Sequence, residues 1–450
     1  MKKVFLAALL TLLIVSIPSI TQPEEETTLK PHDPIYIDEN QNFTLENGVV
    51  SGSGTEDDPY IIEGWEIIGG DFGIRIEDTD VYFVIRNCAV REAESNGIVL
   101  KKVINGQIEN CTVQEVLRED GIVLTNSHNC TVADNLVENS YAHGIALFTS
   151  DNNVLKANTL KSNSLAKLYH GIKLFGSSHN LLLRNSARYN KIGIEVRDLN
   201  GHGIFSVENI LLENIASDNE VDGIRLLHAI DTTLVGNTVS NNHEVGIRLY
   251  ESSGSSIYHN NLFGNALNAS DSLASENQWD NNVEGNYWSD YSGWDRNGDG
   301  ISDIPYRIEG GGLDRFPLMR SWKPGVVVMG VKFTGPDEFV TVRNWSEEDV
   351  DLTAWQLQSV DLGTEEVVYA FLFPVGCQLP ANGKIRVHSG PAATGRENNP
   401  CGSPEMDLYQ GWNDLEDGGY VWDDLEGIVQ LINDEGEVAD EYKYHWWMGG

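Results

Sequence analysis

Basic residues are scarce in this chain. Its 450 residues include 30 Lys and Arg against 68 Asp and Glu, which gives a formal net charge of −38. Nucleic acids and anionic membrane surfaces attract positively charged proteins, so this balance excludes them as binding partners. The same acidity favours solubility and the binding of divalent cations.

Long apolar runs are equally rare. One extends over residues 4–17, after two lysines and before a stretch of small residues. This order is typical of a secretory signal peptide, which we place at residues 1–21. No later run has the length that spans a bilayer. We therefore expect an exported protein, secreted or at the cell surface, with no transmembrane anchor after signal removal.

Cysteine and methionine are few, with five of each. Cys377 and Cys401 flank a Pro- and Gly-rich loop, and we expect a disulfide between them. Cys88, Cys111 and Cys130 each stand in an Asn-Cys-x-Val pattern. This pattern predicts three buried thiols, stacked one above another, that act as small apolar side chains. A thiolate metal site is the alternative, although the spacing resembles no zinc knuckle.

The most prominent feature of the chain is a repeat. Eight Gly-Ile pairs occur at intervals of 22 to 30 residues, beginning at residues 73, 97, 121, 144, 171, 193, 223 and 246. Each pair starts an alternating apolar pattern that ends in polar turn residues, which predicts one short strand per repeat. Such units bury their apolar residues only when they stack. The Gly suits either a crowded bend or a positive φ angle.

Asn recurs five residues apart in the return half of several repeats. The pairs are Asn158 and Asn163, Asn185 and Asn190, Asn214 and Asn219, and Asn237 and Asn242. Stacked Asn amides can form hydrogen bonds from layer to layer. We therefore expect Asn ladders at the turns.

Both ends of the repeat region resemble a known family. Residues 52–65, which include the run Glu-Asp-Asp-Pro-Tyr-Ile-Ile-Glu-Gly-Trp, resemble the entry strand of NosD-like right-handed parallel β-helix proteins. Residues 285–291, 303–306 and 314–318 resemble the closing segment of the same family. The resemblance implies a pectin-lyase-like β-helix with repeats at 46–270, a linker and cap start at 22–45, and a C-terminal cap at 271–324. It also raises copper delivery as a role, although no Met-rich or His-rich cluster supports a copper site.

The last part of the chain, residues 325–450, contains longer alternating runs. Segments 338–344, 350–357, 379–383 and 436–442 resemble in succession a lamin-tail domain. That family is an immunoglobulin-like β-sandwich used for attachment or interaction in secreted proteins. The predicted fold class is therefore all-β, with a right-handed parallel β-helix followed by an immunoglobulin-like β-sandwich.

An Asp-rich loop is the clearest candidate metal site. Its oxygen ligands would be Asp295, Asn297, Asp299, Ile301 through its carbonyl, and Asp303. Their spacing matches a calcium loop of the EF-hand type, although Tyr306 replaces the final Glu. The loop predicts Ca²⁺ as a cofactor, and a solvated turn without metal is the alternative.

The outward positions of the Gly-Ile strands form two columns that mix aromatic and charged residues. The candidate ligand-binding residues are Phe148, Lys173, Phe175, Glu195, Arg197, Arg225, Arg248 and Tyr250. Aromatic rings stack on sugars, and charged groups bind hydroxyls or carboxylates. We expect an envelope or extracellular glycan, or another surface protein, as the partner. Ladders that only stabilise the sheet are the alternative.

Catalytic signals are weak. Gly201-His202-Gly203 is similar to the Gly-His-Gly of polygalacturonases, but the acidic elements of that family are missing. Arg225 and Arg248 are candidate bases for a lyase, which would also need clustered acids.

A second candidate cluster is the column of residues that directly precede the repeat glycines. Asp120, His143 and His170 lie in successive layers of this column and could share an ion or act as an acid–base pair. The alternative is that these turn residues are exposed to solvent and have no functional role. The sequence thus favours non-catalytic binding or a structural role, with a polysaccharide lyase or hydrolase acting on acidic glycans, or copper delivery, as alternatives.

Overall fold

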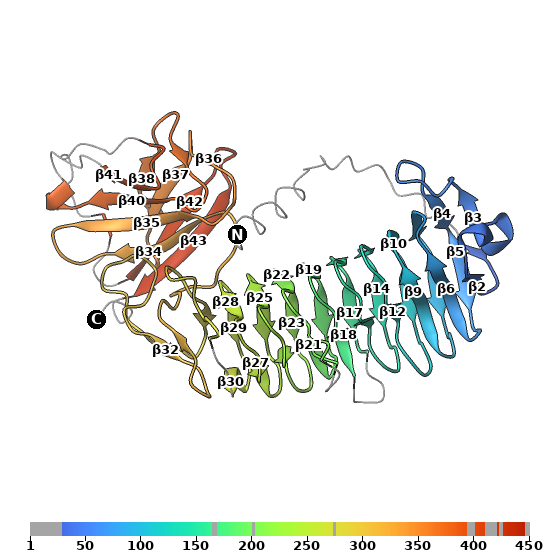
Figure 1. Ribbon diagram of the computed structural model, residues 1–450. Coiled ribbons are helices and arrows are strands. Elements are labelled where there is room, and N and C mark those ends of the chain that lie inside the picture. Colours follow the sequence, from blue (N-terminus) through green and yellow to red (C-terminus); the bar gives the residue numbers. More distant parts are fainter. Residues whose placement is uncertain are drawn as a thin grey trace.

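The computed structural model describes residues 29–163, 169–199, 203–272, 276–393, 401–409, 421–422 and 426–445. This part of the chain is all-β apart from three 3-10 turns, η1 (Asn40–Asn42), η2 (Leu45–Asn47) and η3 (Pro391–Ala393). An elongated solenoid leads into a sandwich at its C-terminal end (Figure 1). The predicted fold class is confirmed. The predicted signal peptide lies outside the described residues.

The Gly-Ile strands form one of three long sheets, which we call the Gly-Ile sheet. Its strands are β2 (Ile35–Ile37), β6 (Phe72–Thr79), β9 (Asn96–Val103), β12 (Ile122–Thr125), β15 (Ile145–Phe148), β18 (His170–Phe175), β21 (Ile192–Arg197), β24 (Ile224–Leu227), β27 (Val245–Tyr250) and β30 (Leu267–Ser272). Ile98, Ile122 and Ile145 pair in register and are fully buried. The alternating pattern thus sends one apolar column into the axial core.

Two further parallel sheets close each coil. The second sheet contains β3 (Val49–Ser51), β4 (Tyr60–Glu63), β7 (Phe83–Arg86), β10 (Gly106–Glu109), β13 (Thr131–Ala133), β16 (Val154–Lys156), β19 (Leu181–Leu183), β22 (Ile210–Leu212), β25 (Thr233–Val235) and β28 (Ser256–Tyr258), with β3 antiparallel to β4. The third sheet contains β1 (Lys30–Pro31), β5 (Trp65–Ile68), β8 (Ala89–Arg91), β11 (Thr112–Gln114), β14 (Leu136–Glu138), β17 (Thr159–Lys161), β20 (Ser186–Arg188), β23 (Ile215–Ser217), β26 (Thr238–Ser240), β29 (Asn261–Phe263) and β31 (Tyr287–Trp288). One strand of each sheet per coil makes a three-sided solenoid.

Crowding between coils explains the repeat glycines. A Cβ added to Gly193 would lie 2.6 Å from the carbonyl oxygen of Gly223 and 2.9 Å from the Asn219 amide nitrogen. The φ angle of Gly193 is not positive. These glycines therefore allow close contact with the next coil, and a left-handed backbone is not the reason for them.

The predicted Asn ladders are present and fully buried. Asn158 donates from Nδ2 to the Val132 carbonyl at 2.8 Å and to Asn185 Oδ1 at 2.9 Å. Its own Oδ1 accepts from the backbone N–H of Asn135 at 3.1 Å. A parallel ladder through Asn163 and its counterparts follows the same scheme. Each amide thus satisfies turn groups of two neighbouring coils, which a buried backbone requires.

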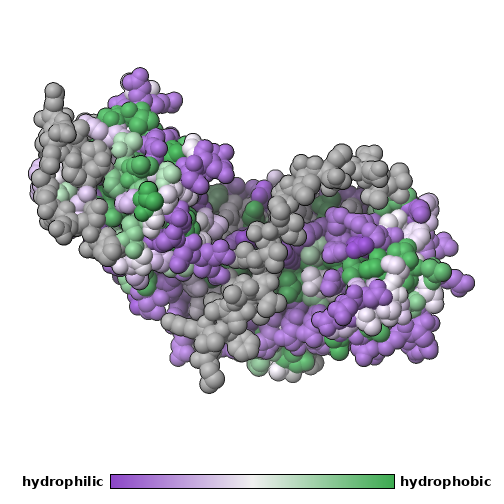
Figure 2. All heavy atoms as spheres, turned by 90° about the horizontal axis from the view of Figure 1, so that it is seen from above, coloured by the Kyte–Doolittle hydropathy of each residue, from purple (hydrophilic) through white to green (hydrophobic). Residues whose placement is uncertain are grey.

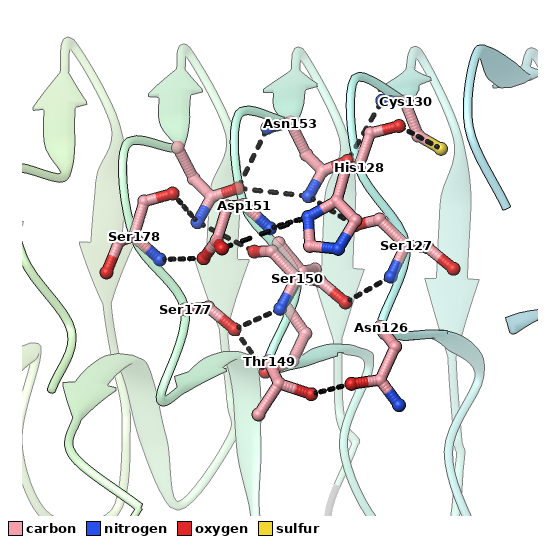
Figure 3. A network of polar contacts seen from close by, with 12 residues as sticks. Asn126, Ser127, His128, Cys130, Thr149, Ser150, Asp151, Asn153, Ser177 and Ser178 are labelled. Atoms are coloured by element: carbon pink, nitrogen blue, oxygen red, sulfur yellow. Dashed lines mark hydrogen bonds and ion pairs between the residues drawn. The ribbon is translucent and has the colours of Figure 1, made fainter. Parts of the chain in front are cut away.

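A third ladder follows the ends of the Gly-Ile strands, and Figure 3 shows it. The N–H of Ser127 donates to Ser150 Oγ at 3.0 Å, and the N–H of Ser150 donates to Ser177 Oγ at 3.0 Å. Beside it, His128 Nδ1 accepts from the N–H of Asp151 at 3.0 Å. Polar side chains thus link the coils at every corner of the solenoid.

The cysteines do not all share one column. Cys88 and Cys111 occupy matching positions because Ala89 pairs with Thr112. Cys130 lies on a different corner, since Thr131 after it pairs with Gln107 in the second sheet. The prediction of three stacked thiols is therefore wrong for Cys130, although all three thiols are buried. The Asn-Cys-x-Val pattern misleads because two corners of the coil accept the same short motif.

The sandwich consists of two four-stranded sheets and a short strand pair. One sheet has the order β34 (Val326–Lys332), β35 (Glu338–Asn344), β40 (Lys384–Ser389) and β41 (Glu405–Tyr409). The other has the order β38 (Val367–Leu372), β37 (Gln356–Val360), β42 (Glu426–Ile432) and β43 (Val438–His445), while β36 (Val350–Asp351) pairs with β39 (Gln378–Leu379). Between them, Val340, Leu357, Ile385 and Val429 belong to one buried apolar cluster.

Buried carboxylates join the two domains. Glu284 of the solenoid cap accepts from Trp345 Nε1 at 3.1 Å and lies 3.1 Å from Arg343, both of the sandwich. Asp440 of β43 lies 2.8 Å from Arg320, which precedes the sandwich. Because each carboxylate is buried and neutralised across the boundary, the sandwich is packed onto the solenoid end. On the face shown in Figure 2, hydrophilic side chains lie beside hydrophobic patches on both domains.

Candidate functional site

The outward side of the Gly-Ile sheet brings the predicted ligand residues together. Lys173 pairs in register with Glu195, Glu195 with Arg225, and Arg225 with Arg248, across β18, β21, β24 and β27. Arg197 lies in the adjacent column, in register with Phe175. We call this surface the cationic face, defined by Lys173, Glu195, Arg197, Asp222, Arg225 and Arg248.

Glu195 is the centre of the cationic face. Its carboxylate is 2% exposed and lies 3.7 Å from Lys173, 3.9 Å from Arg197 and 3.8 Å from Arg225. Burial opposes its ionisation, yet His170 and these cations together lower the pKa of Glu195 to about 2. Burial lowers the pKa of Lys173. The carboxylate therefore stays ionised and holds three long cationic side chains in place.

A second buried carboxylate, Asp222, was absent from the predicted site. Its Oδ2 accepts from Arg225 Nε at 2.7 Å and from Arg248 Nε at 2.8 Å. Asp222 is fully buried, and its bond to Arg248 raises the pKa of that guanidinium. The sequence signal was its place directly before a repeat Gly, in the column with Asp120. Acids thus converge beside both candidate arginines.

The aromatic residues of the predicted site differ in their surroundings. Phe148 packs against an apolar cluster of Val99, Val123 and Ala146 on the outer side of the sheet. Phe175 lies 5.1 Å below the Lys173 ammonium and 5.4 Å from the Arg197 guanidinium. Only Tyr250 is well exposed among the three, at 40%. Phe175 therefore supports the cations, and Tyr250 is the ring most open to a ligand.

The residues before the repeat glycines form a ladder of their own. Asp120 Oδ1 accepts from the N–H of His143 at 2.9 Å, and His143 Nδ1 accepts from the N–H of His170 at 3.0 Å. All three are buried, so the solvated alternative is wrong. Burial raises the pKa of Asp120 to about 7 and lowers the pKa of His143 well below its usual range. For Asp120 and His143 this is a structural role.

His170 departs from that ladder. Its Nδ1 has no hydrogen-bond partner within the described structure, and its Nε2 lies 3.3 Å from Glu195. Burial lowers the pKa of His170, which favours the neutral imidazole. His170 thus combines an Nε2 atom close to the Glu195 carboxylate with an Nδ1 atom that is buried and unpartnered.

The candidate catalytic residues have different outcomes. His202 lies outside the described residues. Arg225 and Arg248 are both held by Asp222, and a guanidinium bound to a carboxylate keeps its proton. Their geometry therefore suits anion binding better than proton abstraction.

The Asp-rich loop packs against the sandwich. Gly298 accepts through its carbonyl from Thr341 Oγ1 at 2.8 Å, and a Cβ on Gly300 would lie 2.5 Å from the Met329 carbonyl oxygen. Asp295 binds its own loop, since its Oδ2 accepts from the N–H of Gly300 at 2.7 Å. The loop is thus part of the contact between the domains.

Within the described residues, no three His, Cys, Asp or Glu side chains converge as they would around a metal ion. In the Asp-rich loop, Asn297 Oδ1 accepts from the N–H of Asp299, and Asp303 Oδ2 accepts from the N–H of Arg296. Burial, followed by the charge of Asp299, raises the pKa of Asp295 to about 7. Asp295 and Asp299 are oxygen donors that suit Ca²⁺, which would need further oxygens from Asn297 and the Ile301 carbonyl. Calcium at this loop stays a prediction.

Cys377 and Cys401 form a disulfide with a Cα–Cα distance of 4.9 Å. Cys377 belongs to the apolar cluster of the sandwich, and Cys401 packs against it. None of the described residues form a helix long and apolar enough to cross a membrane.

Two family models match this chain. The model of the right handed beta helix region matches residues 97–263, and the Lamin Tail Domain model matches residues 321–445. The chain is a β-helix protein with a lamin tail domain. The cationic face of this β-helix protein lies within residues 97–263, which the first model matches. The two matched regions correspond to the three-sheeted solenoid and to the sandwich.

Short segments of the β-helix protein resemble two curated proteins, both described as probable ABC transporter binding protein NosD. The Pseudomonas aeruginosa protein is 40% identical over 55 residues, which is 12% of this chain and 13% of that protein. The Stutzerimonas stutzeri protein is 62% identical over 29 residues, which is 6% of this chain and 7% of that protein. The matches thus cover only a small part of either relative.

Comparison with solved structures also found two enzymes. The Azotobacter vinelandii mannuronan C-5 epimerase AlgE4 A-module is 17% identical, with 55% of this chain and 72% of that chain covered and a TM-score of 0.35. The pectate lyase Pel9A is 14% identical, with 68% and 84% covered and a TM-score of 0.39. Likeness of this degree carries no argument about the reaction.

Proposed function

We propose that the cationic face binds an anionic glycan at the outside of the cell. The observation that carries this proposal is a locally positive surface on a protein whose overall charge is strongly negative. Four cations, Lys173, Arg197, Arg225 and Arg248, stand against three carboxylates that contact them, Glu195, Asp222 and Glu244, whereas the whole chain has a net charge of −38. One positive charge thus remains in excess for a ligand.

The geometry favours a long ligand that carries repeated negative charges. The cations lie on four successive strands of a parallel sheet, about 4.8 Å apart from one strand to the next. Glu195 and Asp222 are buried, so Lys173 and Arg225 can present their outer donors to uronate carboxylates or sulfates. Arg248 also contacts the exposed carboxylate of Glu244 at 3.2 Å, which a ligand carboxylate would have to displace. The exposed ring of Tyr250 adds a surface on which a sugar can stack.

Export supports the choice of an extracellular ligand. The apolar segment after Lys2 and Lys3 is the basis for expecting a secreted or surface-bound protein. A lamin tail domain at the end of the solenoid suits attachment to a surface or to another protein, which would present the cationic face at a fixed orientation.

Calorimetric titration of the full chain with a uronic acid polymer tests the proposal, with an uncharged glucan of similar length as the reference. We expect binding to the uronate polymer only, weakened by added salt because exposed charges are screened. Arg225→Gln and Tyr250→Ala should each weaken binding about tenfold, equivalent to about 1.4 kcal/mol. Arg118→Gln is the matched control, since it removes one cation that is 73% exposed and that does not belong to the cationic face. Equal binding of both polymers, or none, contradicts the proposal.

A second candidate, proton transfer on the bound uronate, is favoured by one observation: the Nε2 atom of His170 lies 3.3 Å from Glu195, while its buried Nδ1 has no hydrogen-bond partner. Such a site would remove a proton next to the sugar carboxylate, as lyases and epimerases acting on acidic glycans do. Incubation with the same polymers in deuterated water checks it. Deuterium incorporation or chain cleavage that His170→Gln abolishes would establish catalysis, and unchanged polymer would leave binding as the function.

A further inference from the structure

The two stacked cysteines of the solenoid interrupt an otherwise uniform column. The corner that holds Cys88 and Cys111 continues with Asn in every later coil. These residues are Asn135, Asn158, Asn185, Asn214, Asn237, Asn260 and Asn286. The Asn ladder thus ends at Cys111, whose backbone N–H still donates to Asn135 Oδ1 at 2.9 Å. The first coils of the solenoid lack the amide links that hold the rest.

Cys88 and Cys111 meet the spatial requirement for a covalent link. They stand in register on adjacent coils, and the N–H of Thr112 donates to the Cys88 carbonyl at 2.9 Å. In-register neighbours in parallel sheets lie about 4.8 Å apart, inside the range of roughly 4.4–6.8 Å between the Cα atoms of disulfides. Both side chains are buried, at 2% and 1% exposure. The two sulfurs have matching surroundings, since Cys88 Sγ donates to the Arg86 carbonyl at 3.3 Å and Cys111 Sγ donates to the Glu109 carbonyl at 3.4 Å.

Cys88 and Cys111 are the only two cysteines of the described solenoid that can pair with each other. Cys377 and Cys401 are already joined in the sandwich, and Cys130 lies at a different corner of the coil. Of the three remaining thiols, only Cys88 and Cys111 share a column. An exported protein folds where disulfides form and persist.

We propose that Cys88 and Cys111 form a disulfide between neighbouring coils that replaces the missing Asn rungs. In this step the two thiols lose two protons and two electrons. The electrons pass to the disulfide of an exported dithiol oxidoreductase or of a small oxidised thiol, which leaves as two thiols. Because both sulfurs are buried in the folded solenoid, the exchange takes place during folding. The link anchors the N-terminal coils, where the sheets begin.

Peptide mapping of the exported full-length protein tests this directly. Free thiols are alkylated under denaturing, non-reducing conditions, and the protein is then digested. We expect one linked peptide pair that contains Cys88 and Cys111, with Cys130 alkylated. The Cys377–Cys401 link serves as the internal control for oxidising conditions. If that control pair is linked while Cys88 and Cys111 are both alkylated, the proposal is overturned.

A stability measurement provides the second test. In the variant Cys88→Asn/Cys111→Asn the Asn column would extend through all coils without a covalent link. We expect reductant to lower the Tm of the wild-type protein by several degrees more than that of the variant, since loss of Cys377–Cys401 affects both equally. Equal shifts overturn the proposal. If the double variant does not fold, Cys111→Ser should turn Cys88 into an alkylated residue in the peptide map, and a persistent Cys88 link to another cysteine contradicts the pairing.

Discussion

Two sets of buried polar side chains run along the solenoid and obey opposite rules. In the Asn ladders the same residue recurs in coil after coil, and its partners are always in the neighbouring coils. On the cationic face the residue changes with each coil, from Lys173 to Glu195 to Arg225. The repeated Asn residues thus form hydrogen bonds with backbone groups, whereas the residues that vary from coil to coil include those that can bind a ligand. The predictions below test this difference, beginning with the largest expected effect.

Removing one rung of the Asn ladder should have the largest effect on stability. Asn185→Ala deletes the amide that donates to the Leu155 carbonyl and accepts from the N–H of Asn158. Two buried backbone groups lose their partners, so we expect a loss of about 3 kcal/mol in the free energy of unfolding. Chemical denaturation measures it, with Gln41→Ala as the control because that amide is exposed. A loss as small as that of the control would mean that the rungs contribute little.

Neutralising Glu195 should cost somewhat less and should change the response to acid. Its pKa of about 2 lies below the unfolded value, so its ionised form stabilises the protein above about pH 4.5 and that contribution disappears as the pH falls toward 2. Glu195→Gln should therefore lose about 2 kcal/mol at pH 7 and be less sensitive to acid. Denaturation at several pH values checks this. A constant difference between the two proteins from pH 7 to pH 3 would refute the electrostatic role.

Asp120 should behave in the opposite way, because it occupies a ladder position with an ionisable group. Its pKa of about 7 lies above the unfolded value, so stability falls as the pH rises from about 4 to 7, by at most about 1.4 kcal/mol per unit. Asp120→Asn keeps an oxygen for the N–H of His143 and should gain about 1 kcal/mol at pH 8. Matched unfolding curves at pH 5 and pH 8 measure it, and a stability loss at pH 8 would contradict the structural role.

The smallest effect is expected outside both sets. Arg118 is exposed and lies 3.8 Å from Glu94, which is also exposed. Arg118→Ala should change the free energy of unfolding by less than about 0.5 kcal/mol, since exposed ion pairs contribute little. Thermal unfolding checks the result, and a larger loss would show that surface charge pairs outside the cationic face also stabilise the solenoid.

Sequence reasoning was most successful where the residues repeat. The Gly-Ile spacing predicted which residues share a layer, and it placed Lys173, Glu195 and Arg225 in adjacent rows, as the structure has them. It failed where one motif fits two places, as for Cys130. It also missed Asp222 as a site residue, because burial of a carboxylate between two arginines depends on side-chain directions that spacing does not encode.

The sequence by itself determined the stacked all-β architecture, the order of the two domains and the columns on the Gly-Ile sheet. These follow from local periodicity, which each repeat carries within its own residues. Only the tertiary structure decided which polar side chains form hydrogen bonds with the backbone and which can contact other side chains or a ligand. Asp120 and His143 accept bonds from the next coil, whereas His170 in the same column keeps Nδ1 vacant and faces Glu195. The distinction arises between coils, from contacts that no single repeat contains.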